Sequence, residues 1–116
     1  MRRFETRTLG ILQGSMVLFS DYKDNGQMWT GAGERELQRE IKFTEVFREP
    51  PVVQVSMSMW DIDQTTSPRV DLSYNRVECG GFWIAFRTWG DTRVARVRAD
   101  WTAMGPLHDA DDWQLY

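Results

Sequence analysis

The sequence is poor in the residues on which most enzyme mechanisms and metal sites depend. Cys79 is the only cysteine and His108 the only histidine in 116 residues. A single cysteine excludes an internal disulfide framework and a thiolate metal cluster. With a single histidine, near the C-terminus, the chain lacks the residues for a Ser-His-Asp or Cys-His catalytic site and for a multi-histidine metal site. We therefore expect no catalytic residue, no metal site and no cofactor, and a fold that is stabilised by packing.

Long apolar runs and an excess of positive charge are also missing. No stretch approaches the roughly 18 consecutive apolar residues of a membrane span, so we expect no membrane insertion. No apolar run follows Arg2 and Arg3, which predicts that a standard secretory signal is absent and leaves the compartment open between the cytoplasm and export by another route. The chain has 17 acidic and 14 basic side chains, and Asp109, Asp111 and Asp112 account for the difference. A neutral body with an acidic end lacks a basic stripe, so we expect no nucleic-acid partner.

Apolar and polar residues alternate in short runs, which is typical of half-buried β-strands. The length is that of one domain, expected over residues 1–108, with 109–116 as a short acidic C-terminal tail. Six runs separated by turn residues predict an all-β protein, a six-stranded antiparallel β-sandwich in which each sheet buries one face. Residues 20–38 are expected to be a long irregular connection. The runs lie near residues 13–18, 41–43, 53–60, 69–74, 82–87 and 93–103.

Three tryptophans, Trp60, Trp83 and Trp89, are out of phase with the apolar series of their strands. Their side chains are therefore expected on the outer faces of the sheets. Because a large apolar area exposed to water is unusual on a small monomer, we interpret these positions as facing a partner or a ligand.

Several stretches between residues 9 and 105 together resemble the H-type lectin domain of snail agglutinins and of the discoidin carboxy-terminal region. The resemblance implies the same six-stranded sandwich, assembled as a homotrimer or as a hexamer of two trimers. It also implies a site for galactose or N-acetylgalactosamine in a cleft between neighbouring subunits. The stretches include Arg35-Glu36-Leu37, Ile41-Lys42-Phe43, Pro50-Pro51-Val52-Val53 and Arg87-Thr88-Trp89-Gly90-Asp91-Thr92-Arg93-Val94.

The resemblance also assigns residues to the carbohydrate site. Arg69 matches the family arginine that hydrogen-bonds sugar hydroxyls, and Trp89 matches the tryptophan on which the sugar packs from the adjacent chain. A pyranose has an apolar C–H face and a fringe of hydroxyls, so an aromatic platform beside a directional donor suits it. Gly90 stands where the snail proteins often have histidine, and Asp91 or Glu34 is our hypothesis for the sugar-hydroxyl acceptor.

Two further positions depart from the family. Ala32 stands where a loop aspartate receives sugar hydroxyls, and Ala95 where a further aromatic residue contacts the sugar. The galactosamine specificity of the snail proteins therefore does not transfer to this sequence.

Each site residue has a structural alternative. Trp89 has an interface or core position as its alternative. For Arg69 the alternative is a cross-strand ion pair with an acidic neighbour such as Asp71 or Asp100, a type of pair that is common and contributes little. Both alternatives are left open by the sequence.

The sequence thus predicts a non-catalytic lectin for glycan recognition and cell adhesion, with glycans and further copies of itself as partners. The second hypothesis is a structural or adhesive trimer, such as a component of a phage-like tail or surface fibre, that has lost the sugar site. Gly90 and Ala32 favour this alternative. Asp61 and Asp63 form a D-x-D pattern that suits a cation such as calcium, but we interpret it as a loop cap.

Overall fold

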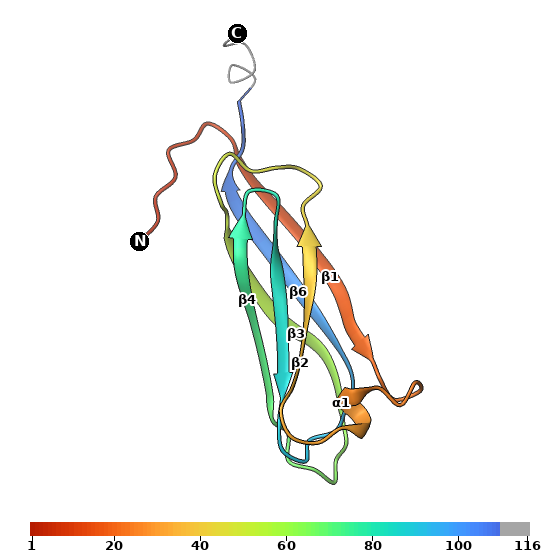
Figure 1. Ribbon diagram of the computed structural model, residues 1–116. Coiled ribbons are helices and arrows are strands. Elements are labelled where there is room, and N and C mark those ends of the chain that lie inside the picture. The colour runs from red at the N-terminus through yellow and green to blue at the C-terminus, as the bar shows by residue number, and fades with distance from the viewer. Residues whose placement is uncertain (110–116) are drawn as a thin grey trace.

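The computed structural model describes residues 1–109 and is built almost entirely of β-strands, as Figure 1 shows. Two antiparallel three-stranded sheets, in the orders β1-β6-β3 and β2-β5-β4, form the two layers. The predicted six-stranded antiparallel β-sandwich is therefore confirmed. Of the expected tail over 109–116, all but Asp109 lies outside the described residues. The elements are β1 (Leu9–Ser20), α1 (Gln27–Thr30), β2 (Arg35–Lys42), β3 (Val52–Ile62), β4 (Val70–Glu78), β5 (Gly81–Thr88) and β6 (Val94–Pro106).

The core lies between β5 and β6, the central strands of the two sheets. Phe82, Ile84 and Phe86 alternate along β5 and are buried, and Val97 and Ala99 do the same along β6. Strand residues of one phase point into this core, so those of the other phase lie on the outer faces of the sheets. A binding site on this protein is therefore expected on the outer faces of the sheets or in the loops.

A close contact between strands fixes the packing of β1 against β6. Gly14 lies opposite Trp101 in the β1–β6 register, and a Cβ on Gly14 would come within 2.5 Å of the indole. Only glycine therefore leaves room for the ring. The indole reaches the other sheet, where its ring centroid lies 5.7 Å from that of Phe82 in an edge-on arrangement. Trp101 is therefore packed against the core.

The segment over residues 20–38 is more ordered than the sequence predicted. It contains α1, and β2 begins at Arg35, which pairs with Thr88 of β5. The alternation of apolar and polar residues in β2 is weak. One of the inward positions is occupied by a charged residue, the buried Arg35. In the part of the chain that the structure describes, α1 is the one helix, and with four residues it is far too short to cross a membrane.

Candidate functional site

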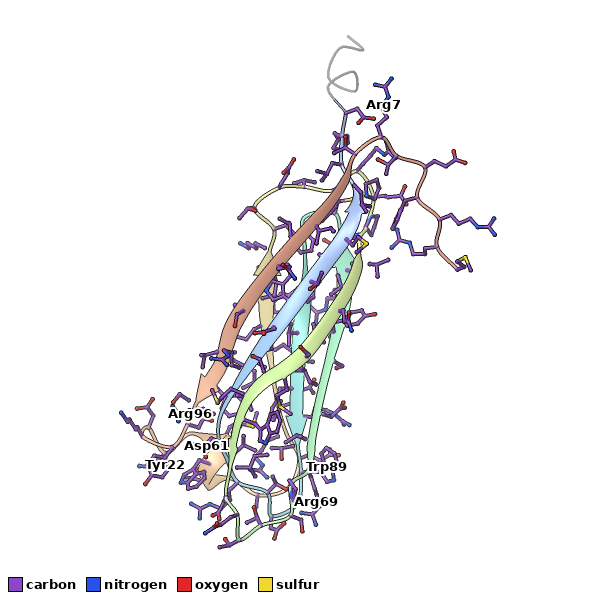
Figure 2. All side chains as sticks on the ribbon, turned by 180° about the vertical axis from the view of Figure 1, so that it is seen from behind. Arg7, Tyr22, Asp61, Arg69, Trp89 and Arg96 are labelled. Carbon is purple, nitrogen blue, oxygen red and sulfur yellow. The ribbon has the colours of Figure 1, made fainter. Side chains whose placement is uncertain are left out.

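The predicted site residues lie at one end of the sandwich. Arg69 immediately precedes β4, and Trp89, Gly90 and Asp91 follow β5 in the turn that leads to β6. Figure 2 shows Arg69 and Trp89 close to each other at this end. The antiparallel pairing of β4 with β5 explains this, because it brings the start of β4 beside the end of β5.

Arg69 forms an ion pair with Asp91. Its Nη1 donates to Oδ1 of Asp91 at 2.5 Å and also lies 3.4 Å from the hydroxyl oxygen of Thr92. Both charged side chains remain partly exposed, so the guanidinium keeps free N–H donors and the carboxylate keeps free lone pairs. A surface pair of this kind contributes little to stability but leaves directional polar groups accessible to a ligand.

The two acidic residues that were alternative partners for Arg69 bind elsewhere. Asp71 pairs with Arg87 at 3.3 Å, in the neighbouring strand of the same sheet. Asp100 accepts a hydrogen bond from Ser58 at 2.8 Å in the opposite sheet. Arg69 does form an ion pair, as the structural alternative expected, but its partner is Asp91 in the turn after β5 and neither Asp71 nor Asp100.

Gly90 allows the turn to pass close to Arg69. Its φ of +70° is in the left-handed region that favours glycine, and a Cβ there would lie 3.1 Å from Nη1 of Arg69. Its carbonyl oxygen accepts from the N–H of Gly33 at 2.9 Å and from Nη2 of Arg35 at 3.3 Å. Gly90 thus positions Arg69 and Asp91 and joins the turn to the loop before β2.

Arg35 connects the loops of this end, a role that the sequence analysis missed. It is only 7% exposed, and burial lowers the pKa of its guanidinium. It donates to four backbone carbonyls in place of a carboxylate partner. No pattern in the sequence indicated this role, because Arg35 lies in the segment that was expected to be an irregular connection. The acceptors are the carbonyl oxygens of Gly33 at 3.0 Å, Gln27 at 3.3 Å, Met28 at 3.1 Å and Gly90 at 3.3 Å.

Trp89 is 38% exposed, so the alternative of a core position is wrong. It lines a shallow, open pocket of about 250 Å³ together with Glu34 and Arg87. The Arg87 guanidinium lies 5.8 Å from the centroid of the indole ring. Arg69 is not among the residues that line this pocket, although it lies near Trp89 at the same end of the sandwich.

The two departures from the family pattern have different surroundings. Ala32 is exposed in the loop before β2, where its methyl group offers no hydrogen-bond acceptor. Ala95 is buried at the start of β6 and lines a second pocket together with Tyr22 and Trp29. The aromatic side chains that line this pocket therefore come from the loop after β1 and from α1.

Asp61 and Asp63 have different partners. Asp63 accepts hydrogen bonds from the hydroxyl and the N–H of Thr65 at 2.7 and 2.8 Å, and these bonds hold the pKa of its carboxyl below the usual range. Its other oxygen faces Arg93, whereas Asp61 pairs with Arg96 at 3.5 Å. Within residues 1–109 no three acidic, cysteine or histidine side chains gather as a metal site would require. Asp63 acts as a loop cap.

Comparison with known proteins gives consistent matches. The sequence profile of the H-type lectin domain matches residues 38–104. "ATP synthase subunits region ORF 7" of Fuscovulum blasticum is 50% identical over 108 residues, which cover 93% of this chain and 94% of that protein. A discoidin-1 polypeptide of Dictyostelium discoideum is 32% identical over 81 residues, 69% of this chain and 32% of the discoidin-1 polypeptide.

A solved structure with the same fold is that of discoidin II from Dictyostelium discoideum. It superposes with a TM-score of 0.74 at 20% sequence identity. The match covers 90% of this chain but only 40% of the discoidin II chain. This chain therefore corresponds to less than half of each discoidin.

Proposed function

The chain belongs to the H-type lectin domain family, and from this premise we propose that it is a non-catalytic lectin that binds glycans at subunit interfaces. The observation that carries the proposal is the exposed indole of Trp89 at the same end of the sandwich as the Arg69–Asp91 pair. The indole suits the apolar face of a pyranose, and the ion pair suits its hydroxyls. Galactose, N-acetylgalactosamine and related sugars are the first ligands to test.

The proposed cleft is shared between two chains. In one chain Trp89 and Glu34 line a pocket without Arg69, whose guanidinium is directed to Asp91. A neighbouring copy would supply the missing half, with Trp89 of one chain facing Arg69 of the next. Glu34, which has no ion pair among residues 1–109, would then be an acceptor for sugar hydroxyls next to the indole.

The outer face of the β1-β6-β3 sheet supports self-association. Ile11, Met104 and Val52 are all exposed and lie next to one another in a single row across the three strands. Leu9, also exposed, extends this apolar patch along β1. Because contiguous apolar surface on a small protein marks contact sites, we propose this face as the place where copies meet in a trimer or hexamer.

Assembly would also strengthen binding. A single shallow sugar site commonly binds in the millimolar range, about −4 kcal/mol. Linked sites that engage one surface together raise the avidity by roughly 10² to 10⁴ when the geometry permits. The proposed oligomer would therefore serve cell adhesion better than a single chain.

Two observations favour the alternative of a structural or adhesive trimer without a sugar site. Asp91 already neutralises Arg69, and Ala32 provides no further acceptor. A protein of this kind would bind one fixed protein partner, for example in a tail or surface fibre, and no glycan.

A glycan array with three proteins tests the proposal. The native oligomer is expected to bind a set of glycans, and Trp89→Ala to weaken that binding by about tenfold or more, because the stacking platform is removed. Trp60→Ala is the matched control, since Trp60 is more exposed than Trp89 and lies on β3 outside the proposed cleft. Undiminished binding by Trp89→Ala would refute the site. A blank array for the native oligomer, with a single copurifying protein, would establish the alternative.

A further inference from the structure

A second surface pocket lies at the same end of the sandwich but apart from the Trp89 pocket. It forms where the loop after β1 meets β3 and β6 and has a volume of about 340 Å³. Figure 2 shows Tyr22, Asp61 and Arg96 grouped on one side of this end, with Arg69 and Trp89 on the other. The lining residues are Ser20, Tyr22, Lys23, Trp29, Asp61, Ala95 and Arg96.

The wall of this pocket is an aromatic pair. Tyr22 is 58% exposed, and its ring packs edge-on against Trp29 with the centroids 5.0 Å apart. The Arg93 guanidinium lies 4.2 Å from the centroid of the Trp29 ring, and its Nε donates to the Trp29 carbonyl at 2.9 Å. Arg93 thus holds Trp29 in place through both its ring and its carbonyl oxygen, while the ring of Tyr22 remains accessible.

The loop that carries Tyr22 is anchored to the body of the protein. The N–H of Asp21 donates to the carbonyl of Ala95 at 2.6 Å, and its carboxylate accepts from the N–H of Met28 at 3.0 Å. The Met28 side chain is fully buried in the core. Since the loop is already ordered, a ligand that stacks on Tyr22 loses little free energy in ordering it.

Polar groups face this aromatic wall across the pocket. Asp61 and Arg96 lie opposite each other in β3 and β6 and form an ion pair at 3.5 Å, with both side chains about half exposed. The pair is long and exposed, so a carboxylate oxygen and several guanidinium N–H groups remain for a ligand. Ala95 also lines the pocket and contributes only a methyl group.

We propose that this pocket is a second saccharide site, contained within one chain. Tyr22 is the platform for the apolar face of a pyranose, Asp61 accepts from one hydroxyl and Arg96 donates to its neighbour. The combination of an aromatic face with an adjacent donor and acceptor is what a ring with vicinal hydroxyls requires. This site does not depend on the Trp89 cleft, because it shares no lining residue with it.

Saturation-transfer NMR with methyl glycosides of galactose, N-acetylgalactosamine, glucose and mannose tests the second site. Trp89→Ala is expected to keep saturation transfer to at least one glycoside, and adding Tyr22→Ala to remove it. In the Trp89→Ala background, Asp61→Asn should weaken the same binding by about tenfold, the effect of one lost charged hydrogen bond. Tyr74→Ala is the control, an exposed tyrosine on β4 that lines neither pocket.

The outcomes separate the two sites. If Trp89→Ala alone abolishes all transfer, the Tyr22 site is refuted and the Trp89 site stands. If Tyr22→Ala alone abolishes it, the Tyr22 site stands and the Trp89 site is refuted. No transfer to any glycoside in the native protein refutes both. Tyr22→Phe, which keeps the ring, must retain binding, and a matching thermal unfolding curve shows that a loss is not caused by misfolding.

Discussion

The guanidinium of Arg35 donates hydrogen bonds to backbone carbonyl oxygens of three separate segments. These are α1, the loop before β2 and the turn after β5. Arg69, in contrast, is held by one carboxylate near the surface. The first residue fixes the positions of the loops, and the second keeps donors available. The two arginines are therefore expected to differ in effect, with Arg35 determining stability and Arg69 determining binding.

Asp63 gives a test by pH. Hydrogen bonds from Thr65 first, and then the charge of Arg93, lower the pKa of Asp63 in the folded state. The carboxylate therefore stabilises the fold above the unfolded-state pKa of about 4, and this contribution is lost as the pH falls through the lower folded-state value. We expect Asp63→Asn to be less stable than the native protein at pH 7 and the difference to shrink below about pH 4.

Urea unfolding at several pH values measures this difference in unfolding free energy. Asp24→Asn is the control, because Asp24 is an exposed carboxylate in the loop after β1. A difference between native protein and Asp63→Asn that stays constant from pH 7 to pH 3 would contradict the assigned role.

The sequence was sufficient to predict that the side chain of Trp89 is exposed. Trp89 is out of phase with the buried residues of β5, and a period of two was enough to place it outside. The pairing of Arg69 with Asp91 was out of reach, because it joins positions 22 residues apart that meet only once β4 pairs with β5. Arg35 was missed because nothing local shows that its partners are carbonyls.

The strands themselves were predictable wherever one face is apolar. β5 and β6 have regular alternation because their inner residues form the centre of the core. β2 lacks that signal, so its first residues were assigned to a loop, and its pairing with β5 had to come from the structure. The Tyr22 pocket was also hidden, since it is assembled from three segments distant in the sequence.

The packing of β1 against β6 depends on a residue without a side chain. Gly14→Ala places a methyl group against Trp101, which cannot move without disturbing Phe82. We expect the free energy of unfolding to fall by about 1–3 kcal/mol, as for other overpacked cores. Chemical denaturation measures the change. Gly80→Ala is the control, because a Cβ there meets no atom within 4 Å, and an equal loss for both variants would contradict the account.

For the whole molecule, the proposed assembly combines two features that lie at opposite ends of the sandwich. The apolar row on the outer face of the β1-β6-β3 sheet offers a surface for assembly, and the loop end carries two half-sites that one chain does not join. In one chain the guanidinium of Arg69 does not line the pocket of the Trp89 indole. We therefore propose that glycan binding requires the oligomer, with Trp89 and Arg69 contributed by neighbouring chains.

Mixed oligomers test this claim most directly. Arg69→Ala and Trp89→Ala are each expected to lose binding at the shared cleft, measured by isothermal titration with a glycan that the native protein binds. When the two variants are coexpressed and mix at random in a cyclic oligomer, about a quarter of the clefts regain an intact arginine beside an intact tryptophan. Recovery of about a quarter of the native binding capacity is the predicted result. No recovery in oligomers shown by mass to contain both variants would contradict a cleft shared between chains.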